Sequence, residues 1–143
     1  PWFRLFVSLS EDGTTLAIGA PDEDNRKGAV KVFAWDAAAS NFTQLGQGIR
    51  GKAAKDHFGA SVALSSDGNA VAVGAPQYGT GKAGYAEVHG REEVTSSHRQ
   101  IGRRVDGKGG DDEFGRNVAF SGDGRVLAVG ASKNDGNGKN SGE

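Results

Sequence analysis

The carboxylate side chains that gather in two polar segments are the residues with the clearest capacity for chemistry. One segment spans residues 22–25 and reads Asp-Glu-Asp-Asn, and the other contains Asp135. Carboxylate and amide oxygens are the ligands that hard cations such as calcium prefer. Asp22, Asp24 and Asp135 are therefore weak candidates for a metal site. Calcium needs six to eight oxygens, and neither segment supplies enough carboxylates for us to predict a site.

Catalytic motifs are not found among the remaining reactive side chains. The histidines His57, His89 and His98 show no His-Glu-x-x-His spacing, and no serine lies in a Gly-x-Ser-x-Gly turn. The chain contains no cysteine, which excludes a thiol nucleophile and a thiolate metal site. We therefore predict that the protein is not an enzyme.

The composition favours a β protein and argues against several classes of partner. Gly accounts for 24 of the 143 residues, and the hydrophobic fraction is only 36%. Such a composition is typical of sheets joined by tight turns. The formal net charge is −1 with basic and acidic residues interspersed, so we predict no nucleic-acid binding. No apolar run approaches the roughly 18 residues of a transmembrane helix, and we predict no direct membrane insertion.

A sequence repeat places these polar segments at regular positions. Asp67 follows Asp12 by 55 residues, and Asp123 follows Asp67 by 56. The same spacing relates the glycines Gly19, Gly74 and Gly130. A long internal period is typical of architectures in which each repeat is one supersecondary unit. We predict repeats at residues 1–57, 58–113 and 114–143, of which the third contains only half of the pattern.

The first half of each repeat predicts two strands joined by a tight turn. In repeat 2 the residues alternate from Phe58 through Ala60 and Val62 to Leu64, which indicates a strand that begins at Phe58. A Ser-x-Asp-Gly turn follows, and Asp-Gly between apolar runs is a strong hairpin signal. The second strand, around residues 71–73, is apolar on both faces, which predicts that both faces are covered.

The second half of each repeat predicts two more strands. They are expected near 30–33 and 43–49 in repeat 1, and near 86–89 and 99–105 in repeat 2. Four antiparallel strands with one strand covered on both faces describe a propeller blade. We therefore predict an all-β fold, a β-propeller fragment of about two and a half four-stranded blades. A β-sandwich is the alternative, but a sandwich does not require a 55-residue period.

Two short motifs recur where the strands of each repeat begin and end. They are Phe58-Gly59 with Gly74-Ala75-Pro76 in repeat 2, and Phe114-Gly115 with Gly130-Ala131-Ser132 in repeat 3. This pattern resembles the FG-GAP repeat of integrin α-type propellers. The Ser-x-Asp-Gly turns at Asp12, Asp67 and Asp123 resemble a subgroup in large surface proteins of microbial eukaryotes. The resemblance implies a ring of typically seven blades, outside the cell or at the cell surface, that mediates adhesion or ligand binding.

The hairpin turns differ from the calcium-binding pattern of many such repeats. That pattern is Asp-x-Asp/Asn-x-Asp-Gly-x-x-Asp, whereas repeat 2 has Ala63, Ser65, Asp67 and Val71 at the four ligand positions. Too few oxygen ligands remain to hold calcium. We therefore interpret these Ser and Asp residues as turn formers and predict no calcium and no other cofactor.

The loops that follow the second strand differ between repeats, whereas the strands do not. Variable loops on a constant scaffold are where recognition usually occurs. We therefore predict that a protein or glycan ligand contacts these loops, at Asp22, Glu23, Asp24, Asn25, Gln77, Tyr78, Asn134 and Asp135.

Three further positions carry local predictions. Asn41-Phe42-Thr43 fits the N-glycosylation pattern, which makes Asn41 a candidate glycan site in a secreted protein. Asp56 and Asp112 each precede Phe-Gly by two residues, and we expect their side chains to bond backbone at a blade connection. The acidic cluster at residues 111–113 is expected to be solvated.

Three functional hypotheses follow from the sequence. The first is a non-enzymatic extracellular or cell-surface propeller segment for adhesion or for protein or glycan interaction. The second is a structural building block, in which the missing blades are supplied by more chain or by other copies of this chain. The third is part of a propeller enzyme whose active site lies outside these residues.

Overall fold

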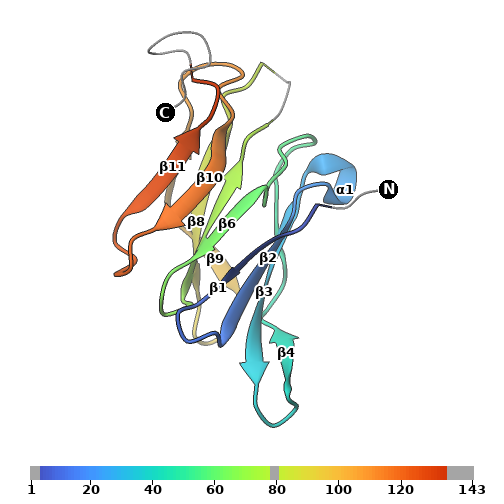
Figure 1. Ribbon diagram of the computed structural model, residues 1–143. Helices are drawn as coiled ribbons and strands as arrows, with labels where there is room; N and C mark the ends of the chain where they lie inside the picture. Colours follow the sequence, from blue (N-terminus) through green and yellow to red (C-terminus); the bar gives the residue numbers. More distant parts are fainter. Residues whose placement is uncertain (1–3, 78–80, 135–143) are drawn as a thin grey trace.

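The computed structural model describes residues 4–77 and 81–134, and it consists almost entirely of antiparallel β-sheets (Figure 1). Blade 1 is a sheet of order β1-β2-β3-β4 in which β5 also pairs with β3. Its strands are β1 Phe6–Leu9, β2 Thr15–Ala20, β3 Ala29–Asp36, β4 Asn41–Gln44 and β5 Ile49–Arg50. Blade 2 has the order β6-β7-β8-β9, with β6 Ser61–Leu64, β7 Ala70–Ala75, β8 Tyr85–Arg91 and β9 His98–Asp106. Blade 3 pairs β10 Phe114–Phe120 with β11 Leu127–Ala131. This arrangement is the all-β propeller fragment that the repeat predicts.

The fourth strand of blade 1 differs from the prediction because it is broken. One continuous strand was expected over residues 43–49, but β4 ends at Gln44 and β5 starts at Ile49. Gly46 lies between them with a φ of +59°, which interrupts an extended backbone. The corresponding strand of blade 2, β9, is continuous from His98 to Asp106.

The loop that follows β2 contains a single short turn, α1, from Glu23 to Arg26. Asp24, Asn25 and Arg26 have positive φ values of 49°, 53° and 61°, so this turn is left-handed and not an α-helix. Asp and Asn tolerate this conformation better than most residues. Within the described ranges, no helix has the length and apolar character needed to cross a membrane.

The three Ser-x-Asp-Gly hairpin turns have the same hydrogen bonds. In blade 2 the hydroxyl of Ser65 donates to Asp67 Oδ1 at 2.6 Å, and the Asn69 backbone N–H donates to the same oxygen at 3.0 Å. The turns at Asp12 and Asp123 repeat both bonds. These hydrogen bonds lower the pKa of all three aspartates, with Ser65 the largest cause at Asp67. Each carboxylate therefore closes its own turn.

The sheets stack face to face, and the middle blade is covered on both sides (Figure 1). In β7 every residue from Val71 to Ala75 is buried, as expected for a strand without a polar face. In β2 burial alternates, because only the side of Thr15, Ala17 and Gly19 meets blade 2. The prediction that the second strand is covered on both faces therefore holds for blade 2 but is wrong for the described parts of blades 1 and 3.

The Phe-Gly motif joins neighbouring blades and does not start its own strand in blade 2. The strand β6 begins at Ser61, not at Phe58 as the alternation predicts. The Phe58 backbone N–H donates to the Lys27 carbonyl at 3.0 Å, and Phe58 forms a parallel bridge with Gly28 of blade 1. Phe114 repeats this geometry with Ala83 and Gly84 of blade 2.

Glycines allow the blades to approach closely at these junctions. Gly59 and Gly115 have φ values of +89° and +90°, which L-residues with a side chain rarely adopt. A Cβ on Gly19 would overlap the Gly59 carbonyl oxygen, and a Cβ on Gly74 would overlap that of Gly115. The glycines of the Phe-Gly and Gly-Ala-Pro motifs are thus in backbone contact across each junction.

Candidate functional site

The acidic loop of blade 1 is neutralised by basic residues of the same chain. Arg4 donates from Nε and Nη2 to the two carboxylate oxygens of Asp22, each at 3.2 Å. These bonds, together with the Arg4 charge, hold the pKa of Asp22 below its usual value despite partial burial. The other two ion pairs are Glu23 with Arg50 at 3.4 Å and Asp24 with Lys27 at 3.3 Å. The three carboxylates point to separate cations and do not converge on one point.

Two of the predicted ligand residues are used inside the fold. Gln77 donates from Nε2 to Asp56 Oδ1 at 2.7 Å, and Asn134 donates from Nδ2 to Asp112 Oδ2 at 3.2 Å. Both aspartates are buried, with 2% and 5% of their surface exposed. Tyr78 and Asp135 lie outside the described residues. The loops remain predicted ligand contacts, but the side chains of Gln77 and Asn134 fasten each loop to the preceding linker.

Asp56 is the centre of a larger network than the sequence predicts. Its carboxylate accepts a backbone bond from the Ala53 N–H at 3.0 Å, as expected for a blade connection. It also accepts a hydrogen bond from the Tyr85 hydroxyl at 2.9 Å. Burial, followed by this bond to Asp56, raises the pKa of Tyr85. The Arg104 guanidinium lies over the Tyr85 ring, 4.5 Å from its centroid. No single-sequence signal connects Asp56 with Tyr85, because they are 29 residues apart.

The acidic cluster beside Phe114 is largely buried, which corrects the expectation that it is solvated. Glu113 is 5% exposed and pairs with Arg116 at 2.6 Å and Lys133 at 2.7 Å. Burial raises the pKa of Glu113, but the hydrogen bonds from Lys133, Arg116 and Ser132 outweigh it and the net pKa is lowered. The equivalent residue at the other junction is His57, whose ring lies 3.6 Å from Asp22.

A polar notch of about 360 Å³ lies at the edge where the variable loops emerge. Three segments line it, namely the blade 1–2 linker, the loop after β7 and the end of β9. The lining residues are Lys52, Ala53, Asp56, Gln77, Lys82, Ala83, Gly84, Arg104 and Asp106. Arg104 pairs with Asp106 at 2.8 Å, and Lys52 pairs with the buried Glu87 at 2.9 Å. Lys82 is exposed and has no ion-pair partner within residues 4–77 and 81–134, so it gives the notch an excess of positive charge.

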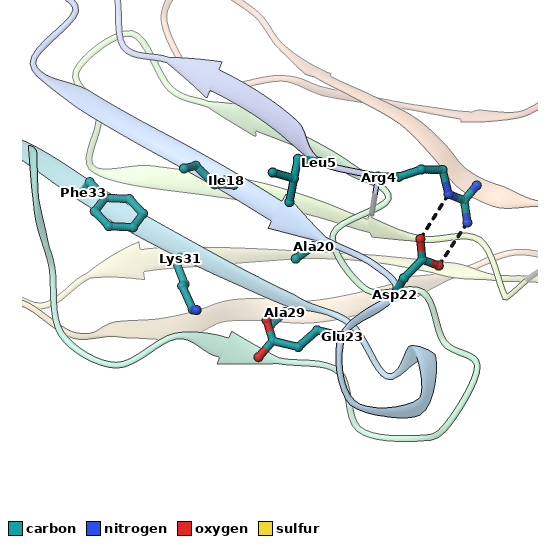
Figure 2. A pocket seen from close by; sticks show the side chains of 9 residues that line it. All are labelled: Arg4, Leu5, Ile18, Ala20, Asp22, Glu23, Ala29, Lys31 and Phe33. Carbon is teal, nitrogen blue, oxygen red and sulfur yellow. Dashed lines mark hydrogen bonds and ion pairs between the residues drawn. The ribbon is translucent and has the colours of Figure 1, made fainter. Parts of the chain in front are cut away.

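A second hollow, of about 470 Å³, lies on the outward face of blade 1 (Figure 2). Its floor is apolar and consists of Leu5, Ile18, Ala20, Ala29 and Phe33. Figure 2 shows the Arg4–Asp22 pair at one end of this hollow, with Glu23 and Lys31 along its edge. The equivalent face of blade 2 is covered by blade 1, so the hollow has the character of a blade face and not of a small-molecule site.

Metal ligands and the glycan candidate are placed as follows. Within the described ranges, no three His, Cys, Asp or Glu side chains come together as a metal site. His57 and His89 belong to the blade 1–2 junction, where His89 Nε2 lies 3.0 Å from Glu87 Oε2. Asn41 is exposed at the start of β4, directly after the turn of the β3–β4 hairpin. Its position makes the side chain accessible to a glycosyltransferase.

Antiparallel blades that stack face to face through a repeated junction define a class of protein, and this chain is a fragment of a β-propeller. A family model described as FG-GAP repeat matches residues 105–143, from the end of β9 through β10 and β11. The chain belongs to the FG-GAP repeat family, and its Phe-Gly and Gly-Ala-Pro residues form the blade junctions. Membership of the Ser-x-Asp-Gly subgroup stays a prediction. A search of curated proteins gave no significant match.

Proposed function

We propose that this chain is a non-enzymatic propeller segment, outside the cell or at the cell surface, that binds a protein or glycan ligand at its variable loop edge. The polar notch carries this proposal. It combines side chains from three segments, it lies among the loops that differ between repeats, and it has the volume of a small binding site. Family membership supports a propeller of the adhesion type.

The chemistry of the notch favours binding over catalysis. Asp56, which would be the natural general base, already accepts hydrogen bonds from Ala53, Gln77 and Tyr85. A base engaged in this way is poorly placed to accept a proton from a substrate. The excess charge of Lys82 instead favours a ligand that carries carboxylate or sulfate groups.

A glycan-array experiment with a matched pair of charge variants tests this proposal. We expect the purified chain to bind acidic glycans, and Lys82→Glu to weaken that binding by about tenfold through repulsion at the notch. Arg125→Glu is the control, because Arg125 lies on the β10–β11 turn at the opposite edge of the blades. Equal binding by the two variants, or binding to no acidic glycan, would contradict a ligand site in the notch.

The extracellular part of the proposal has its own test at Asn41. Expression through a eukaryotic secretory pathway should give a chain that loses mass on treatment with a peptide-N-glycosidase. Thr43→Ala should abolish the mass loss, whereas Thr43→Ser should retain it, because the acceptor pattern needs a hydroxyl at this position. A chain that carries no glycan on Asn41 after secretion would remove this support.

A further inference from the structure

The outward face of blade 1 is an exposed apolar surface that continues across the sheet. Leu5, Val7 and Leu9 are 62%, 67% and 58% exposed. The strand register places Ile18 beside Val7 and Leu16 beside Leu9 on the same face. The face continues outward to Trp35, which is 45% exposed and packs edge-on against Phe42 with ring centroids 5.3 Å apart. We call these residues the blade 1 outer face.

The internal repeat shows what kind of surface covers such a face. Leu9 and Val7 correspond to Leu64 and Val62 of blade 2, which are 55 residues further on. Leu64 is only 8% exposed because it packs against blade 1, where its backbone N–H accepts contact with the Ser8 hydroxyl oxygen at 3.0 Å. The covering surface of blade 1 consists of small residues, including Ala17 and Gly19.

Blade 3 presents a surface of the same small-residue kind. Ala128 corresponds to Ala72 of blade 2, which is fully buried against blade 3. In blade 3 itself, Asn117, Ala119 and Ala128 are exposed. We call these residues the blade 3 outer face. The molecule therefore displays both halves of an interface that it uses twice internally, and the two halves lie on opposite sides of the stack (Figure 1).

We propose that a second copy of this chain docks head to tail, with its blade 3 outer face on the blade 1 outer face of the first copy. The contact joins different surfaces on the two copies, so it can add further copies. It goes beyond the proposed ligand binding, because the polar notch lies at the loop edge and stays accessible when blade faces stack.

Two residues make this contact weaker than an internal junction and give it a recognisable salt dependence. Arg4 occupies the position of Gly59, so the close backbone approach of a Phe-Gly junction is not available there. Lys31 and Lys108 occupy the positions of Glu87 and Lys52, which form an ion pair at the internal junction. Docking brings these two lysines together, and we expect added salt to strengthen the association by screening their repulsion.

Sedimentation velocity over about a hundredfold range of concentration tests the docking. We expect the wild-type chain to form species larger than a monomer as the concentration rises, and to form more of them at high salt. Val7→Asp on blade 1 and Ala128→Arg on blade 3 should each keep the chain monomeric. Both positions are exposed, and the circular dichroism spectrum and urea midpoint of each variant verify that it is folded.

The mixture of the two variants gives the most specific result. The Val7→Asp chain retains an intact blade 3 face, and the Ala128→Arg chain retains an intact blade 1 face. Head-to-tail docking predicts that the mixture forms a one-to-one dimer and grows no further. A monomeric mixture, a wild-type chain that never associates, or a Val7→Asp chain that associates like wild type would overturn the proposal. Ligand binding by the notch is measured separately with Lys82→Glu, so failure of one proposal is distinguishable from failure of the other.

Discussion

The blade 1 outer face and the matching face of blade 2 have related sequences in opposite environments. Leu9 and Leu64 are the same residue at the same repeat position, yet they are 58% and 8% exposed. Ile18 is half-buried, whereas its counterpart Val73 is fully buried. The difference shows that a repeat determines its strands, while the neighbouring blade determines which of its side chains contribute to stability.

The outer strands of the two faces differ in chemistry as well as in burial. Phe33, Trp35 and Phe42 of blade 1 correspond to His89, Arg91 and His98 of blade 2. His89 packs against the Phe58 ring at the junction, with ring centroids 6.0 Å apart. The face that an internal junction covers thus tolerates polar residues with partners, whereas the outward face has aromatic residues in their place.

Truncation of the two equivalent leucines should give the largest difference. We expect Leu64→Ala to lower the free energy of unfolding by about 2–5 kcal/mol, because it leaves a cavity between blades 1 and 2. Leu9→Ala should change it by less than about 0.5 kcal/mol in dilute solution, because Leu9 is exposed. Urea denaturation measures both values. Similar losses for the two variants would show that the faces are not in different environments.

A methyl group placed at a blade junction should have the next largest effect. Gly74→Ala puts a Cβ against the Gly115 carbonyl oxygen, and we expect it to destabilise the chain by about 1–3 kcal/mol. Gly122→Ala is the control, because a Cβ there meets nothing within 4 Å. Thermal denaturation of the two variants compares them. A Gly74→Ala chain as stable as the control would exclude the close approach of blades 2 and 3.

The two junctions should lose stability in different ranges of pH. Burial lowers the pKa of His57 below 6.5 despite the nearby Asp22 carboxylate, so the folded chain binds this proton less readily than the unfolded chain. The stability that neutral His57 contributes is therefore present above pH 6.5 and is lost as the pH falls below it. Glu113 has a pKa lowered from 4.5, so its contribution is lost only as the pH falls below about 4.5.

Substitution of His57 separates these two ranges. We expect His57→Asn to reduce the loss of stability just below pH 6.5 and to leave the loss below pH 4.5 in place. Asn tolerates the φ of +55° at this position. Urea midpoints measured across the acid range give the result. His98 also has a pKa lowered by burial, so part of the loss should remain in the variant. An unchanged pH profile would contradict the role of His57.

The sequence predicted the elements that depend on local chemistry. The Ser-x-Asp-Gly turns and the apolar second strands depend on residues close together in the chain, and they form where the 55-residue spacing places them. The position of Phe58 on the preceding blade could not be read from alternation, because its partner Gly28 is 30 residues away. The burial of Glu113 was missed for a related reason, since Lys133 reaches it from the far end of the next hairpin.

Contact between the glycines of neighbouring blades is the feature on which the whole stack depends, and nuclear Overhauser spectroscopy measures it directly. A Cβ on Gly59 would lie 3.2 Å from Gly19 Cα, so the Hα protons of these two residues must be close. We predict cross-peaks between the Hα protons of Gly19 and Gly59, and likewise between those of Gly74 and Gly115. A folded chain that shows the strand pairings within each sheet but neither of these cross-peaks would contradict the stacked arrangement of the blades.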